Sequence, residues 1–324
     1  MNLSKRDFLT LGAATGASMA LPAWAQSKPL VASINMFVPA APGGGWDGTA
    51  RAIERAAKAA GLVGNMQFEN VGGAGGMVGL PRFVNQRKGQ GNTLMIGGSV
   101  MIGAGIANKS PITIKDVTPI ARLTEEAGVI VVPASGKIKT WKELEAALKA
   151  NPKAVSVAGG SAGGTDHLIL GMLIKALGKS PREAAYVAFA GGGPANAALL
   201  GNQVVAGISG YSEFEEQIKA GKMIPLAVSG KNRIAGVNVP TLLELGVNVS
   251  ESNWRGVFAA PGITDAQREA LTDLVTKIRN SSAWKHELET HKWSDAFLAH
   301  QPFDRDLAKD IADKEVLMKE LGLA

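Results

Sequence analysis

The amino-acid sequence predicts an α/β protein of two lobes, each a mainly parallel sheet flanked by helices. Short apolar runs alternate with amphipathic helical stretches along most of the chain, which is typical of parallel sheets covered by helices on both faces. A glycine-rich loop follows several of the apolar runs. The 324 residues are also enough for two domains that each have a core of their own.

The first strand, loop and helix are predicted close to the N-terminus. The nearly continuous apolar run from Leu30 to Val38 is typical of a strand buried on both faces. A turn over residues 39–45 follows it. After Asp47, alanines and an isoleucine recur at helical spacing until Gly61, which predicts a helix that ends there.

The same pattern is repeated along the rest of the chain. Further strands are predicted at residues 66–71, 93–96, 129–132, 155–158, 186–189, 204–208 and 224–228. Capping boxes at Thr140–Glu143 and Thr264–Gln267 begin two helices, and a long helix over residues 303–321 ends at Gly322.

Residues after Ala260 show helical patterns and no strand pattern. We therefore expect the terminal helices to pack on the first sheet, which makes the first lobe discontinuous. The chain would cross between lobes near residues 123–132 and 253–259. The predicted division gives residues 26–127 and 254–324 to lobe 1 and residues 128–253 to lobe 2.

The first 25 residues have the features of a secretory signal peptide. Lys5 and Arg6 precede an apolar stretch from Phe8 to Leu21, and Ala23-Trp24-Ala25 forms a small-residue cleavage pattern. The apolar stretch is shorter than the roughly 20 residues that span a bilayer. We expect cleavage after Ala25 and export to the periplasm; whether the route is Sec or twin-arginine stays open.

Composition excludes several classes of site. The chain contains no cysteine, so disulfides, thiolate metal sites and cysteine nucleophiles are absent. The formal net charge of +6 favours anionic ligands only weakly. Basic residues are scattered and few aromatics lie among them, so nucleic acid is not an expected partner. No cofactor and no metal is predicted.

The glycine loops are the candidate ligand site. In doubly wound sheets ligands bind beyond the carboxyl ends of the strands. Glycine lets a ligand approach main-chain N–H groups, which bind anions at the start of a helix. A glycine after a strand also simply makes a tight turn, but four such loops, two in each half, favour binding of a carboxylate.

Three other interpretations of these segments remain open. Gly43–Gly48 fits the dinucleotide pattern G-x-G-x-x-G, with Glu69 about 20 residues further on. Gly159–Gly163 fits the nucleophile elbow G-x-S-x-G, so an exported α/β hydrolase with Ser161 as nucleophile is the main alternative, with His286, His291 or His300 as base. His286-Glu287 with His291 resembles a zinc motif, but the histidine spacing of five places them on different helical faces.

Several motifs resemble those of the tripartite tricarboxylate transporter receptors, also called Bug receptors. The first two are Val38-Pro39-Ala40-Ala41-Pro42-Gly43-Gly44-Gly45-Trp46-Asp47 and the stretch from Glu69 to Gly76. Gly159–His167, Ala206–Tyr211 and Asn253–Val257 are similar to the branch that binds tricarboxylates such as citrate. The resemblance extends over the chain that remains after cleavage of the signal peptide.

The resemblance implies a fold and a function. The fold is a periplasmic-binding-protein type II fold, a Venus flytrap whose two lobes close on a small carboxylate. The partner is a two-subunit inner-membrane permease to which the receptor delivers the ligand. The protein would be a monomer and not an enzyme. Ala40-Ala41 stand where many relatives carry a bulkier residue, which leaves the ligand's identity open.

The resemblance also implies the binding residues. Two facing loops would hold the ligand mainly through main-chain N–H groups. Asp47 could cap its helix or orient a water, and Arg255 could bind a carboxylate or join the lobes by a salt bridge. His167 is expected to be structural. The candidate ligand-binding residues are Gly43, Gly44, Gly45, Trp46, Asp47, Gly75, Ser99, Ser161, Ala162, Gly163, Gly164, Thr165, Gly191, Gly192, Tyr211 and Arg255.

Overall fold

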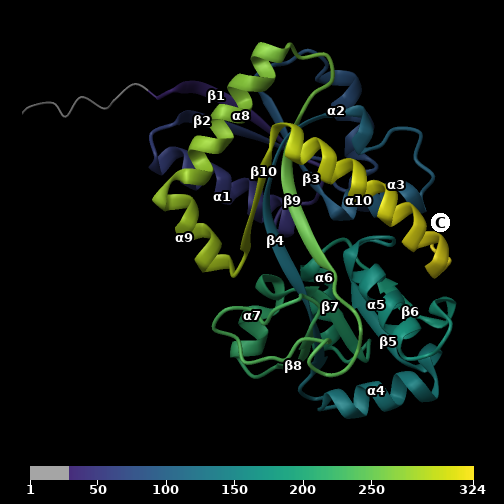
Figure 1. The fold of residues 1–324 in the computed structure, drawn as a ribbon. Coiled ribbons are helices and arrows are strands. Elements are labelled where there is room, and N and C mark those ends of the chain that lie inside the picture. Colours follow the sequence, from purple (N-terminus) through teal and green to yellow (C-terminus); the bar gives the residue numbers. More distant parts are fainter. Residues whose placement is uncertain (1–28) are drawn as a thin grey trace, which may run out of the picture.

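The computed structural model describes residues 29–324, and in them ten strands form one continuous sheet. Eight strands follow the order β2-β1-β3-β9-β4-β7-β5-β6, and β8 and β10 each pair with β4 (Figure 1). The sheet has two halves that share β4. The signal peptide predicted for residues 1–25 lies outside the described residues.

The first half of the sheet is built from the N-terminal strands. Strands β1 (Val31–Val38), β2 (Val63–Asn70) and β3 (Thr93–Gly98) are parallel, and β9 (Ser252–Ala259) is antiparallel to β3. Its first three helices are α1 (Gly45–Ala59), α2 (Gly79–Gln86) and α3 (Ser99–Ala107).

The second half repeats this arrangement. Strands β5 (Ser156–Gly159), β6 (Ala185–Ala188) and β7 (Ala206–Gly210) are parallel, and β8 (Met223–Val228) is antiparallel to β4. The helices of this half are α4 (Trp141–Ala150), α5 (Thr165–Ala176), α6 (Gly192–Leu200) and α7 (Tyr211–Lys219). Short 3-10 helices lie at Ala74–Gly76, Ile114–Asp116, Pro152–Ala154 and Pro181–Glu183.

Strand β4 (Thr118–Pro133) connects the halves. Its residues up to Ala127 pair with β9, whereas those from Gly128 onward pair with β7 and β8. The chain returns beside it, because Glu251 N–H donates to Ser229 of the second half and Ser252 pairs with Ala127. The chain therefore passes between the halves at two neighbouring positions.

The C-terminal segment packs on the first half. It contains α8 (Asp265–Asn280), α9 (Ser282–His291), β10 (Ser294–Ala299) and α10 (His300–Leu321). The prediction of no strand after Ala260 is wrong, because β10 pairs antiparallel with β4. This six-residue strand is partly exposed and shows no alternation of apolar and polar residues, so its sequence carried no strand signal.

Helix α10 also reaches the second half (Figure 1). Near its end, Met318 and Leu321 form a buried cluster with Leu168 of α5. Lys175 of α5 lies 2.7 Å from Glu320. The last turns of α10 therefore contact the second half independently of the two crossing segments.

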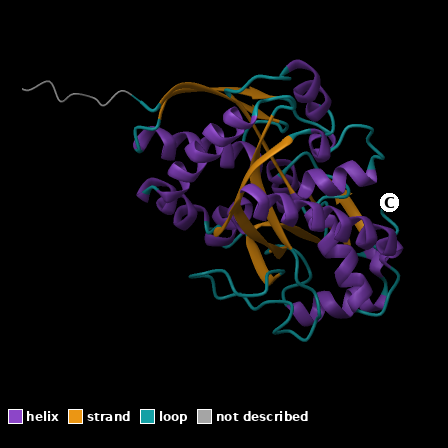
Figure 2. Ribbon diagram, turned by 45° about the horizontal axis from the view of Figure 1, so that its top comes forward, coloured by secondary structure: helices purple, strands orange, loops and turns teal. Residues whose placement is uncertain are grey.

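The predicted α/β class is confirmed, with helices on both sides of the strands (Figure 2). The halves are mixed sheets: each has three parallel strands, and β4 and β9 run antiparallel to their neighbours. Both capping boxes are present, with Thr140 and Thr264 accepting from the residue three positions on. The largest hydrophobic cluster surrounds the first half, and two smaller clusters surround the second.

Candidate functional site

A cavity of about 550 Å³ lies between the two halves of the sheet. The first half contributes the loop after β1, the end of β2 and residues 72–76; the second half contributes the loops after β5, β6 and β7. Asn253 and Arg255 of β9 complete its wall. The cavity thus lies at the carboxyl ends of the parallel strands, where the glycine loops were expected to bind a ligand.

The loop after β1 is closed by its own aspartate. Gly43 has a φ of 83°, and Gly44 is the N-cap of α1. Asp47 accepts hydrogen bonds from the Gly43 N–H (3.1 Å) and from Asn70 Nδ2 (2.9 Å). Asp47 is therefore not the N-cap residue: its side chain folds back and fixes the turn.

The loop after β5 makes the same turn with a histidine. Gly163 has a φ of 76°, Gly164 is the N-cap of α5, and the Gly163 N–H donates to His167 Nδ1 (3.2 Å). The imidazole stacks on Tyr186 with ring centroids 4.2 Å apart. Burial lowers the pKa of His167 to about 4, so the ring is neutral at physiological pH and serves as an acceptor within the loop.

The second loop also packs directly on α3 of the first half. Thr165 Oγ1 donates to Ser99 Oγ (3.1 Å) in a buried contact. A Cβ added to Gly103 would lie 2.0 Å from the Gly163 carbonyl oxygen, and one added to Gly163 would lie 2.7 Å from Ala107 Cβ. Ser99 and Gly163 are therefore contacts between the two halves rather than part of the cavity wall.

A buried ion pair lies on the crossing strands, on the first-half side of the point where β4 changes partners. Arg255 Nη2 of β9 lies 2.7 Å from Glu126 Oε2 of β4, and their side chains are 3% and 1% exposed. Glu126 also accepts from the N–H (3.1 Å) and hydroxyl (2.6 Å) of Ser212 in α7. Arg255 Nε and Nη1 are buried without a hydrogen-bond partner.

Two more carboxyl groups face the cavity. Asp166 accepts from the Gly160 N–H (2.8 Å), and burial, followed by the nearby Glu213 and Glu126, raises its pKa to about 7. Glu213 accepts from the Ser209 hydroxyl and lies close to Gly45 across the cavity, and burial raises its pKa. One arginine is therefore surrounded by three carboxyl groups.

The structure brings together nine of the sixteen residues predicted for the site. Those in the cavity wall are Gly44, Gly45, Trp46, Gly75, Ser161, Gly164, Thr165, Gly191 and Arg255. Those outside it are Gly43, Asp47, Ser99, Ala162, Gly163, Gly192 and Tyr211. Tyr211 is 5% exposed and packs in the core, and a Cβ added to Gly192 would lie 2.9 Å from Glu213.

Sequence reasoning missed five polar residues of the wall: Asn70, Asp166, Ser209, Glu213 and Asn253. Asn70 is the last residue of β2, and Asp166 follows the glycine loop of α5 directly. Their positions at strand and helix ends were a usable signal. The sequence carried no signal for Glu213. It lies in α7, whose pattern of apolar and charged residues predicts an ordinary amphipathic helix with its charged side chains in solvent.

The other interpretations of the loops find no support in the geometry. The chain has four histidines, all within residues 29–324, and none lines the cavity beside Ser161. Glu69 forms ion pairs with Arg82 (2.7 Å) and Arg87, so it is not free for a ribose. His291 contacts Glu287, and within residues 29–324 no group of three or more metal-ligating side chains is present.

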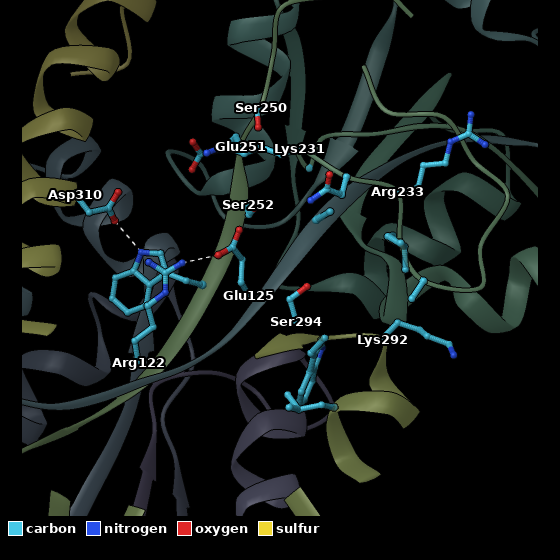
Figure 3. A pocket seen from close by; sticks show the side chains of 18 of the residues that line it. Arg122, Glu125, Lys231, Arg233, Ser250, Glu251, Ser252, Lys292, Ser294 and Asp310 are labelled. Atoms are coloured by element: carbon cyan, nitrogen blue, oxygen red, sulfur yellow. Dashed lines mark hydrogen bonds and ion pairs between the residues drawn. The ribbon is translucent and has the colours of Figure 1, made fainter. Parts of the chain in front are cut away.

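A second cavity, of about 720 Å³, lies on the other side of β4 and β9 (Figure 3). Side chains alternate along β9, so Ser252 and Trp254 face this cavity while Asn253 and Arg255 face the first. Its charged groups are largely paired: Arg122 lies 2.6 Å from Glu125, and Lys314 lies 2.5 Å from Asp310. Lys231 and Lys292 line it without an ion pair to any described residue, so the first cavity is preferred because it lies at the carboxyl ends of the parallel strands.

None of the helices in residues 29–324 is both long and apolar enough to cross a membrane.

Residues 50–323 match the family described as "Tripartite tricarboxylate transporter family receptor". The chain is 28% identical over 214 residues to a protein of Cupriavidus necator named "UPF0065 protein in gbd 5'region", which covers 65% of this chain. The match spans 64% of that relative's own length.

Two solved structures are similar to this one. The periplasmic binding protein BugD superposes with a TM-score of 0.78 at 24% identity, over 90% of this chain and 98% of BugD. This likeness confirms the predicted two-lobed binding-protein fold. MatC of Rhodopseudomonas palustris, solved with bound malate, has a TM-score of 0.71 at 25% identity, over 91% of this chain and 97% of MatC.

Proposed function

Because the chain belongs to the tripartite tricarboxylate transporter receptor family, we propose that this periplasmic solute-binding receptor captures a small carboxylate in the cavity between its two halves. The single observation that carries the proposal is the cavity wall. Residues from both halves and from the crossing strand β9 converge there on about 550 Å³, which is within the usual range for small-molecule sites.

Main-chain and side-chain donors in the wall support an anionic ligand. Two helices, α1 and α5, begin at the cavity with Gly45 and Thr165, and helix N-termini favour negative charge. Arg255 keeps two guanidinium N–H groups without a partner. A carboxylate is the small anion that a guanidinium binds with two parallel hydrogen bonds. The ligand of MatC, malate, has this chemistry.

We further propose that the two halves are lobes that close on the ligand. Lobe 1 would comprise residues 26–127 and 254–324, and lobe 2 residues 128–253. The change of pairing partners at Ala127 and Gly128 of β4 supports a hinge there. Ligand contacts from both lobes would make the closed form more stable, which is how a ligand shifts such an equilibrium.

The receptor would act after export, with its signal peptide cleaved after Ala25. As a monomer it would deliver the ligand, a tricarboxylate such as citrate, to a two-subunit permease in the inner membrane. The binding residues proposed for this role are the nine predicted residues of the cavity wall together with Asn70, Asp166, Glu213 and Asn253.

A thermal-shift screen of the mature chain from Gln26 onward tests the proposal. The panel contains citrate, malate, succinate, other carboxylates, sugars and nucleotides. A ligand at 100 times its Kd stabilises the folded protein by about 2.7 kcal/mol, so one carboxylate should raise the melting temperature by several degrees. No shift with any carboxylate, or a shift with sugars or nucleotides only, would contradict the proposal.

Two matched glycine variants show where the ligand binds. Gly44 lines the cavity and has ordinary backbone angles, so Gly44→Leu should fill the cavity and abolish the shift. Gly48 lies one turn further along α1, outside the cavity wall, and an added Cβ meets nothing within 4 Å. Gly48→Leu should therefore keep the shift; equal behaviour of the two variants would remove the loop after β1 from the site.

A further inference from the structure

The ligand cavity has an acidic side. Asp166 and Glu213 both line it from the second half, on α5 and α7. Asp166 accepts one hydrogen bond, from Gly160, through a single carboxylate oxygen. Each carboxylate has about four acceptor positions, so both side chains keep acceptor capacity that faces the cavity.

A single cation, Arg255, faces these acids. Arg255 is the one lysine or arginine among the described residues of the cavity wall, and it is already paired with the buried Glu126 at 2.7 Å. Tyr186 donates its hydroxyl to the Gly160 carbonyl, and the ring of His167 is taken by the Gly163 N–H. Neither of these two side chains donates a hydrogen bond to Asp166.

A plain dicarboxylate fits such a cavity poorly. Above pH 7, where Asp166 is ionised, a ligand carboxylate placed beside it would be repelled, and water screens this repulsion less in a partly buried site than at the surface. A ligand that places its carboxylate at Arg255 and the helix N-termini, and a hydroxyl or ammonium group at the acids, avoids this cost. A donor on the ligand would also satisfy acceptors that closure removes from water.

We infer that the ligand carries a hydrogen-bond donor, an O–H or N–H group, beside its carboxylate, and that Asp166 and Glu213 are the specificity-determining residues that accept from it. Asn253 extends this acceptor side, because its Oδ1 is buried without a hydrogen-bond partner at the cavity wall. The inference rests on the proposed function and names the class of acid: hydroxy acids and amino acids rather than unsubstituted acids.

Titration calorimetry of the mature chain at pH 8 tests the inference with acids matched in length. The series are succinate, malate and aspartate; glutarate, 2-hydroxyglutarate and glutamate; and tricarballylate and citrate. In the series that binds, we expect the donor-bearing acid to bind at least tenfold more tightly than the unsubstituted one. A preference for malate or citrate identifies a hydroxyl donor, and a preference for aspartate or glutamate identifies an ammonium donor.

The variants Asp166→Asn and Glu213→Gln separate recognition from folding. In Asp166→Asn the amide oxygen can keep the bond from the Gly160 N–H, so the amide NH₂ then faces the ligand's donor. The preference should fall to within about threefold, while the unsubstituted acid binds as before or more tightly. Glu251→Gln is the control, because Glu251 is a partly buried acid at the second cavity, and it should leave the preference unchanged.

The outcomes distinguish the inference from the proposed function. If succinate, glutarate or tricarballylate binds as tightly as its substituted partners, or if the preference survives in both variants, the inference is wrong and the receptor assignment stands. If no carboxylate of any series binds, the proposed function itself fails.

Discussion

The two glycine loops of the cavity have nearly the same backbone but different side chains. Gly43 and Gly163 both have positive φ, 83° and 76°, and each donates its N–H to the side chain four residues on. The N-cap glycines that follow have φ of −84° and −73°. Two positions after them, the first loop has Trp46 and the second has Asp166.

This difference shows how one local structure serves two purposes. Trp46 is 7% exposed and packs its ring near Gly76, so the first loop gives the cavity its shape. Asp166 gives the second loop an acceptor inside the cavity. The backbone turn is thus fixed by glycine and an acceptor side chain in both loops, and the residue between them determines the chemistry.

The largest effect is expected at Arg255, which lies beside the first loop. Its Nη2 would be 2.8 Å from a Cβ added to Gly45. Arg255→Ala leaves Glu126 buried without its counterion, and such a change costs about 3–5 kcal/mol of unfolding free energy. Urea denaturation of the ligand-free protein measures it.

The control is Arg279→Ala. Arg279 pairs with Asp295 at 2.6 Å, but both side chains are about one third exposed, and exposed pairs contribute about 0–1 kcal/mol. Equal losses in the two variants would show that burial of the Arg255–Glu126 pair has no special cost.

A smaller effect should separate the two positive-φ glycines. Gly43→Ala meets nothing within 4 Å and has only the left-handed backbone cost of roughly 1–2 kcal/mol. Gly163→Ala has the same cost and also overlaps Ala107 Cβ at 2.7 Å and the Gly103 oxygen at 2.9 Å. We expect it to lose about 2 kcal/mol more, since overpacking costs about 1–3 kcal/mol.

Denaturation of both glycine variants measures that difference, and small-angle scattering shows whether Gly163→Ala moves the two halves apart. Equal stabilities would mean that the second loop is not wedged against α3. A larger loss in Gly43→Ala would reverse the comparison between the loops.

The smallest expected effect per step, one pH unit, is a pH dependence from Asp166. Between its ordinary pKa of 3.8 and about 7, the folded protein holds a proton on Asp166 that the unfolded chain has released. The unfolding free energy should therefore fall as the pH rises through this window, by up to about 1.4 kcal/mol per pH unit. Asp166→Asn should show a correspondingly flatter profile from pH 4 to 7; identical profiles would contradict the prediction.

The sequence was sufficient to predict the repeated strands, the two capped helices and the loops that meet at the cavity. Local patterns carry these features, because strand burial, capping and glycine turns depend on neighbouring residues. Arg255 was expected to bind ligand or join the halves; it pairs with Glu126 of the same half, and Glu126 in turn bonds to Ser212 of the second half. Local patterns do not reveal β10, which exists through pairing with β4, or Glu213, which reaches the cavity from α7.

The end of α10 gives the molecule a geometric property of its own. Its cluster with Leu168 is a contact between the halves that lies apart from the crossing strands. A rigid rotation that preserves two separate contacts has its axis along the line that joins them. Motion of one half against the other would therefore be a rotation about one defined axis. The position of the contact between the last turn of α10 and α5 would set the direction of that axis.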